Sequence, residues 1–118
     1  MKKTEYTPEE IKFAFDRFIK KCDDMICSYY EHEFRNLDTP SLCVVDGRIY
    51  WRILKGHENE YGGSWTAWGF VRKSDGAIFM AASWSRPNTK GKSAIRGYVT
   101  DSDNGMDNVS PYGVRYAQ

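Results

Sequence analysis

The sequence predicts an α+β domain in which one long N-terminal helix packs on a four- to five-stranded antiparallel meander sheet. Apolar residues recur at steps of three and four between residues 11 and 29, which is the period of a helix. From residue 42 onward they alternate with period two, and glycine-containing turns separate the alternating segments. A chain of 118 residues has room for one domain with a buried core, so residues 1–118 are expected to form a single unit.

The helix is predicted to begin at residues 7–10. Thr7 can cap the first turn, Pro8 suits the first helical position, and Glu10 stands where the acid of a capping box belongs. The helix is expected to run to about residue 34 or 35, because Pro40 cannot continue the hydrogen-bond ladder. Its apolar stripe comprises Ile11, Phe15, Phe18, Cys22, Met25 and Tyr29.

Two hairpins are expected to follow the helix. Residues 42–45 and 48–54 flank Asp46-Gly47, a dipeptide that favours a two-residue turn. In the second of these strands Ile49, Trp51 and Ile53 share one face, which is typical of a half-buried antiparallel strand. Residues 64–73 and 77–84 are expected to pair across a turn at residues 74–76. Residues 94–100 are a candidate fifth strand, and the ring-rich segment 111–116 is expected to pack on the sheet or on a neighbouring subunit.

Composition limits the partners and the compartment. The net charge is only +1, so long-range attraction to a nucleic-acid polymer is expected to be weak and an anionic partner is expected to be small. No apolar run reaches the length of a membrane span, and the N-terminus has no signal-peptide pattern, which predicts a cytoplasmic protein without a membrane anchor. The three cysteines, Cys22, Cys27 and Cys43, fit neither a zinc spacing nor a C-x-x-C motif and are interpreted as reduced, mostly buried thiols.

The most distinctive segment is a basic loop at residues 84–97, which is expected to follow a strand ending at Trp84. No Asp or Glu occurs between Asp75 and Asp101, so the loop's cations have no local carboxylate. Guanidinium and ammonium groups beside an aromatic ring suit a ligand that carries both phosphate and a flat base. A solvated surface loop remains the alternative. The loop's cations are Arg86, Lys90, Lys92 and Arg96.

Motifs that would indicate catalysis or metal binding are incomplete. Gly91-Lys92-Ser93 lacks the earlier glycine of a phosphate-binding loop, and residues 101–105 lack the ligand spacing of a calcium loop, so a turn is the preferred interpretation. His32 and His57 have no helical histidine partner and no adjacent nucleophile motif. We therefore predict no metal, no cofactor and no enzymatic activity, with a cyclic nucleotide phosphodiesterase that uses His32 or His57 as a minor alternative.

Two further groups of residues are left open between a structural and a binding role. The helix carries Arg17, Lys20 and Lys21, which form either a solvated face or a second candidate anion site if two copies pair through the helix. Trp65 and Trp68 are three residues apart on one expected strand, so their side chains point to opposite faces of the sheet. At least one of them is therefore expected to lie in the core or an interface.

Several segments together resemble a family of small phage proteins. They are residues 69–71, 75–78, the Ala-Ala-Ser-Trp-Ser-Arg-Pro run at 81–87, Arg96-Gly97, and a terminal Gly105…Pro111-Tyr112-Gly113…Tyr116. The pattern covers roughly residues 48–118 and is similar to that of the first-type Thoeris anti-defence proteins. Tyr98 stands where the family pattern has asparagine after Arg-Gly, and the linker between residues 88 and 95 also differs.

The resemblance implies a non-enzymatic sponge that sequesters a cyclic nucleotide immune signal in the cytoplasm of the infected bacterial host. The implied ligand is a cyclic ADP-ribose isomer, with cyclic oligonucleotides at a second site, and the implied assembly is a homo-oligomer, either a dimer or an assembly of dimers. A single-stranded nucleic-acid-binding module is the alternative function. The expected ligand-binding residues are Trp84, Arg86, Asn88, Arg96, Asp101, Asn104, Tyr112 and Arg115.

Overall fold

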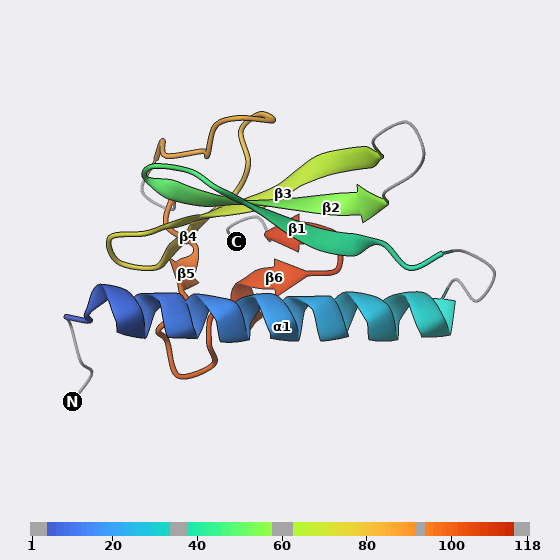
Figure 1. The fold of residues 1–118 in the computed structure, drawn as a ribbon, viewed down its shortest axis with the longest axis horizontal. Coiled ribbons are helices and arrows are strands. Elements are labelled where there is room, and N and C mark those ends of the chain that lie inside the picture. Colours follow the sequence, from blue (N-terminus) through green and yellow to red (C-terminus); the bar gives the residue numbers. More distant parts are fainter. Residues whose placement is uncertain (1–4, 34–37, 58–62, 92–93, 115–118) are drawn as a thin grey trace.

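The computed structural model describes residues 5–33, 38–57, 63–91 and 94–114. Helix α1 (Pro8–Glu33) packs along one face of a five-stranded antiparallel sheet of order β1-β2-β3-β4-β5, which confirms the predicted α+β fold (Figure 1). The strands are β1 (Ser41–Asp46), β2 (Tyr50–His57), β3 (Ser64–Arg72), β4 (Ala77–Phe79) and β5 (Gly97–Tyr98). The short 3-10 helix η1 (Met106–Asn108) leads into a small hairpin of β6 (Val109–Ser110) and β7 (Gly113–Val114).

The predicted capping box begins α1. The Thr7 hydroxyl accepts a hydrogen bond from the Glu10 amide at 3.1 Å, and the Glu10 carboxylate accepts one from the Thr7 amide at 2.9 Å. Four of the predicted stripe positions are buried, but Ile26 takes the place expected for Met25, because the stripe rotates slowly around a helix of 3.6 residues per turn. Tyr29 is half-buried, and the expected end at residue 34 or 35 lies outside the described residues.

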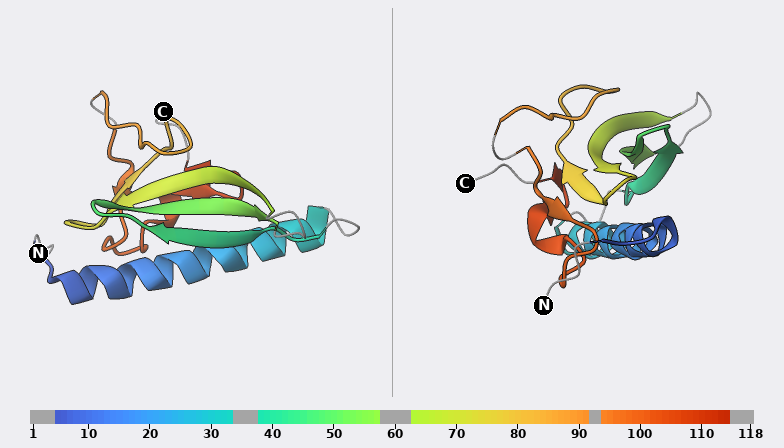
Figure 2. Two further views of the ribbon diagram at one scale, coloured as in Figure 1. Left: turned by 45° about the horizontal axis from the view of Figure 1, so that its top comes forward. Right: turned by 90° about the vertical axis from the view of Figure 1, so that its left-hand side faces the viewer.

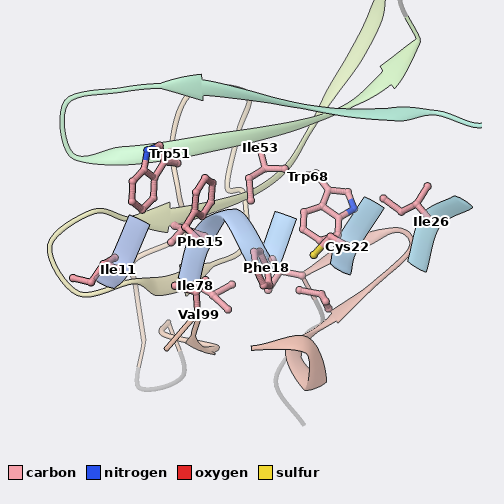
Figure 3. Close-up of a cluster of buried hydrophobic side chains, with 13 residues drawn as sticks. Ile11, Phe15, Phe18, Cys22, Ile26, Trp51, Ile53, Trp68, Ile78 and Val99 are labelled. Carbon is pink, nitrogen blue, oxygen red and sulfur yellow. The ribbon is translucent and has the colours of Figure 1, made fainter. Parts of the chain in front are cut away.

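The main core fills the space between α1 and the sheet. Phe15 stacks on Trp51 with ring centroids 4.2 Å apart, and Phe18 meets Trp68 at 6.5 Å (Figure 3). Val109 and Val114, from the β6–β7 hairpin, belong to the same buried cluster. Residues 109–114 therefore pack between α1 and β3, which agrees with the expectation for the part of segment 111–116 that the structure describes.

A bulge in β3 places Trp68. Ile53 pairs with Gly69 while Leu54 pairs with Ala67, so Trp68 is the extra residue of its strand. An extra residue bends the strand and redirects side chains. Trp68 thereby enters the core with 4% exposure, whereas Trp65 is half-buried, which confirms that at least one of the pair lies in the core.

The first hairpin differs from the prediction. β1 ends at Asp46 and β2 begins at Tyr50, so three residues separate the strands instead of two, and Gly47 is not among the glycines with positive φ. The loop is held by hydrogen bonds from Gly47 N to the Tyr50 carbonyl at 3.0 Å and from Lys73 N to the Ile49 carbonyl at 2.9 Å. Ile49 consequently lies outside β2 and is 58% exposed, so the expectation that it shares the buried face was wrong.

The expected strand over residues 77–84 was also wrong beyond residue 79. Ala82 N and Ser83 N both donate to the Arg86 carbonyl, at 2.9 and 3.2 Å, and this tight turn replaces the sheet ladder. Small alanine and serine side chains offer little packing on a pleated surface. Trp84 lies in this turn, and the expected strand at 94–100 is reduced to β5. The segment from residue 80 to 91 stands on the side of the sheet opposite α1 (Figure 2).

The cysteines are free thiols of differing exposure. Cys22 is buried and Cys27 is half-buried, but Cys43 on β1 is exposed, which corrects the expectation that the thiols are mostly buried. Within the described residues no helix has the length and apolar character that crossing a membrane requires.

Candidate functional site

The turn between β5 and η1, residues 99–105, is held by its own side chains. The Asp101 carboxylate accepts a hydrogen bond from Tyr98 N at 3.0 Å, and the Asp103 carboxylate accepts from Gly105 N and Asp107 N at 2.9 Å each. The Asp107 N–H, followed by that of Gly105, holds the pKa of Asp103 below its ordinary value. The carboxylate oxygens of Asp101 and Asp103 thus accept hydrogen bonds from backbone amides, which is typical of aspartate in a turn. Among the described residues no group of three histidine, cysteine or acidic side chains is placed to hold a metal ion.

Asn104 connects this turn to α1. Its backbone is left-handed, with φ of 60°, and its side chain is only 7% exposed. The amide nitrogen donates to the carbonyl of Ala14 at 3.0 Å and to that of Val99 at 2.6 Å. The side-chain oxygen is buried and has no hydrogen-bond partner, so Asn104 keeps an unused acceptor beneath the turn.

Two adjoining hollows flank the turn, and we call them together the turn cleft. The first, about 260 Å³, lies against the N-terminal half of α1. The second, about 740 Å³, lies towards β5 and η1, and its volume is in the range of small-molecule sites. The residues that line both hollows are Tyr6, Thr100, Asp101 and Ser102.

Two cations from α1 line the first hollow beside Asp101 and Asn104. Arg17 and Lys21 are one helical turn apart, and neither has a carboxylate within 4.0 Å among the described residues. Like charges at this spacing disfavour the helix by a few tenths of a kcal/mol, about 0.2–0.5. The Arg17 guanidinium lies 5.9 Å from the ring of Phe13, which is 65% exposed. An anion placed here would relieve the repulsion.

Lys20 does not share this position. Its side chain is 81% exposed, and its ammonium group is 4.0 Å from the Asp24 carboxylate on the solvent side of α1. The cleft therefore includes two of the three helix residues suggested as an anion site, with Lys20 outside its lining.

Arg96 lines the second hollow. Its Nη2 is 3.3 Å from the sulfur of Met80, a weak acceptor, while Nε and Nη1 are buried without a hydrogen-bond partner. Unpaired buried guanidinium nitrogens are costly, and an incoming acceptor would satisfy them. The same hollow is lined by Asp101, Asp103 and Asp107, so it presents both signs of charge.

Three of the expected ligand-binding residues lie elsewhere, in the segment on the opposite side of the sheet. Trp84 is 49% exposed, Arg86 is exposed, and Asn88 is half-buried with its side chain bonded to Lys90 N at 3.2 Å. None of the three lines either hollow of the turn cleft. One copy of the chain thus does not bring them into the turn cleft, although Asn88 N donates to the carbonyl of Met80 at 2.7 Å and the sulfur of Met80 contacts Arg96.

Tyr112 lies at a third place, where the β6–β7 turn meets the C-terminal half of α1. Its hydroxyl is 2.5 Å from that of Tyr29, a hydrogen bond that raises the pKa of Tyr29 to about 12. Lys55 donates to the Pro111 carbonyl at 2.8 Å, and burial lowers the pKa of its ammonium group. Its Nζ also lies 5.4 Å from the Tyr112 ring centroid. Arg115, the last expected ligand-binding residue, lies outside the described residues.

The two histidines lie at the ends of different elements, His57 at the end of β2 and His32 in the last turn of α1. His57 Nε2 is 2.8 Å from the carbonyl oxygen of Asp38, and His32 is exposed in the last turn of α1. Neither lines the turn cleft.

Sequence reasoning missed Tyr6 and Arg52. Tyr6 precedes the helix, where no periodicity marks it, yet it lines both hollows. Arg52 carries no local signal that sets it apart from other strand residues, and its contact with Trp84 joins residues 32 positions apart.

In comparisons with protein-family models, curated proteins and solved structures, no match to this chain was found.

Proposed function

We propose that this protein is a non-catalytic sponge that binds a small cyclic nucleotide signal in the turn cleft. The observation that carries the proposal is that one hollow holds two cations, Arg17 and Lys21, neither of which has a carboxylate within 4.0 Å among the described residues. The carboxylates of Glu10 and Asp101 line the same hollow and supply acceptors. A ribonucleotide offers the matching groups, because its phosphates are anionic and its hydroxyl and amino groups donate hydrogen bonds.

The second hollow supports the same ligand class. Arg96 brings a guanidinium group with two unsatisfied nitrogens, and the shared lining makes the hollows one continuous surface. Sequestration needs affinity and slow release but no catalytic group. The described lining of the cleft contains no histidine or cysteine to act as a base or nucleophile.

The resemblance to the first-type Thoeris anti-defence proteins narrows the proposed ligand to a cyclic ADP-ribose isomer, held in a phage-encoded homo-oligomer in the bacterial cytoplasm. A neighbouring copy would supply further walls, because both hollows are open on one side in a single chain. In such an assembly, Trp84 or Tyr112 of one copy would reach the turn cleft of another copy.

The decisive experiment mixes the protein with each cyclic ADP-ribose isomer, removes free ligand, heat-denatures the complex and identifies what is released by mass spectrometry. Release of intact ligand is expected. Release of a hydrolysed product would contradict a sponge, and absence of any retained nucleotide would contradict the binding site.

Matched variants then locate the site. Arg17→Ala and Lys21→Ala are each expected to weaken binding about 10- to 100-fold, the effect of one charge-assisted hydrogen bond. Lys20→Ala removes the same type of charge from the same helix but lies outside the cleft, and it is expected to bind normally. Equal losses in all three variants would indicate a general charge effect instead of this site.

A further inference from the structure

The side of the sheet opposite α1 carries an exposed aromatic ring and cations that line neither hollow of the turn cleft. We call this surface the loop face. It is formed by residues 80–91, which lie on the side of the sheet opposite α1 (Figure 2), and by Arg52, which contacts Trp84. Trp84 is the most exposed tryptophan among the described residues, at 49%, whereas Trp51 and Trp68 are almost fully buried. An indole ring that is half exposed to solvent on a polar segment is available to stack on a partner.

Arg52 holds this ring in place. Its guanidinium carbon lies 5.1 Å from the centroid of the Trp84 ring, and its Nη1 donates to the Trp84 carbonyl at 3.1 Å. Both contacts come from β2, a central strand of the sheet, so the ring is attached to a rigid element. The Arg52 Nε is buried without a partner. The Trp84 ring is therefore held in a fixed position before any ligand binds, and the Arg52 Nε–H lacks an acceptor.

The charge on the loop face is not neutralised. Arg86 and Lys90 are exposed, and among the described residues neither has a carboxylate within 4.0 Å. Asp75 is bonded to Arg72 at 2.7 Å. The next acids along the chain, Asp101 and Asp103, line the turn cleft. A net charge near zero thus conceals a locally positive surface.

We propose that the loop face binds single-stranded nucleic acid, with one base stacked on Trp84 and neighbouring phosphates held by Arg86 and Lys90. Every base has a π-face and every linkage a phosphate, so this combination of ring and cations fits a strand of any sequence. The surface is separate from the turn cleft, and its ligand is a polymer instead of a small cyclic nucleotide.

The test titrates the full-length protein into dye-labelled oligothymidylates of 1, 4 and 12 nucleotides and follows the fluorescence anisotropy of the dye, so that variants without Trp84 are measured in the same way. An increase in anisotropy is expected, with affinity that rises with length. The logarithm of the binding constant is expected to fall with the logarithm of salt concentration at a slope of about −1.4, for two phosphates engaged on a single strand by Arg86 and Lys90.

Variants assign the effect to named groups. Trp84→Ala is expected to weaken 12-mer binding about 5- to 150-fold, corresponding to the loss of one stacked base, and Trp84→Phe is expected to restore part of it. Arg86→Gln and Lys90→Gln are each expected to reduce the salt slope by about 0.7. Trp65→Phe changes a half-buried tryptophan outside the loop face and is expected to bind normally.

Three results would overturn the proposal. They are the absence of any binding of the 12-mer, a mononucleotide that binds as tightly as the 12-mer, and equal binding of a polyanion without bases, such as heparin. The turn-cleft variant Arg17→Ala is expected to leave oligonucleotide binding unchanged, so failure here and failure of the sponge proposal are distinguishable.

Discussion

Asn104 donates a hydrogen bond from its side-chain amide to the backbone carbonyl of Ala14, and thereby joins the 99–105 turn to α1. The second bond of the same amide, to the Val99 carbonyl, ties the turn to itself. One buried side chain thus fixes the distance between the two walls of the turn cleft.

Replacing Asn104 by alanine is expected to destabilise the protein by about 2–4 kcal/mol, since two hydrogen bonds are lost and alanine is strained at positive φ. Asn104→Gly loses the same bonds but tolerates the left-handed backbone, so it is expected to recover about 1 kcal/mol of the loss. Urea unfolding measures both values. If alanine and glycine cost the same, the backbone conformation at residue 104 is not a constraint.

Gly56→Ala is expected to be severely destabilising, because a Cβ on this buried strand residue would overlap the carbonyl of Ser64 on β3. The chain would have to separate β2 from β3 next to the core. Gly91→Ala is the matched control: it meets nothing within 4 Å and carries only the strain of its positive φ. Circular dichroism melting of both variants tests this, and a Gly56 variant as stable as the Gly91 variant would contradict the β2–β3 register.

Acid is expected to weaken the 99–105 turn through Asp103. The folded-state pKa of Asp103 lies below the ordinary value of 3.8, so its hydrogen bonds contribute stability that is fully present well above pH 3.8 and is lost as the pH falls through the folded-state pKa. Asp103→Asn should therefore be less stable than the parent at pH 7, with the difference narrowing below pH 3.8. Urea unfolding at pH 7, 5 and 3 measures this, with the exposed Asp24→Asn as control. A constant difference at all three values would exclude a titrating role.

Thiol reactivity is expected to follow burial. Cys43 is exposed, burial and nearby Asp23 raise the pKa of Cys27, and burial raises that of Cys22 far more strongly. An aromatic disulfide reagent should therefore label Cys43 first, Cys27 slowly, and Cys22 only after unfolding. Cys43→Ser should abolish the fast phase. Rapid labelling of Cys22 in the native protein would contradict the packing of α1 on the sheet.

Arg96→Met is expected to weaken nucleotide binding without lowering the melting temperature. The substitution keeps a long side chain against Met80 but removes a guanidinium group whose Nε and Nη1 have no partner, so little folding energy is lost. Thermal melting without ligand, paired with calorimetric titration of the ligand, separates the two effects. A large fall in melting temperature would make Arg96 a structural residue.

Local signals predicted the parts of the fold that local chemistry determines. The Thr7–Glu10 capping box and the apolar stripe from Ile11 to Cys22 depend on neighbours within one or two helical turns, and both are confirmed. The turn at residues 74–76 is similar, because Gly76 adopts a φ of 77°. These features need no knowledge of distant segments.

Long-range contacts explain what the sequence did not reveal. The strand expected over residues 77–84 includes residues 81–84, yet the chain leaves the sheet there. Ala82 and Ser83 bond to the Arg86 carbonyl, and the Arg52 guanidinium group lies over the ring of Trp84. The turn cleft likewise depends on an approach of residues 99–104 to α1, which no local pattern encodes. The sequence predicted two separate sites, one with Asp101 and Asn104 and one on the helix with Arg17 and Lys21. The two groups come together only through tertiary packing.

The sharing of one core by Ile11 and Val114 has a consequence for synthesis of the protein. A ribosome releases the helix and the first strands of the meander before residues 109–114 emerge, and during that interval the side chains that Val109 and Val114 cover face solvent or a chaperone. The nascent chain therefore cannot complete its fold progressively from the N-terminus. We expect arrested chains that end before residue 109 to remain protease-sensitive, and folding to occur as a single late event after the final hairpin leaves the exit tunnel.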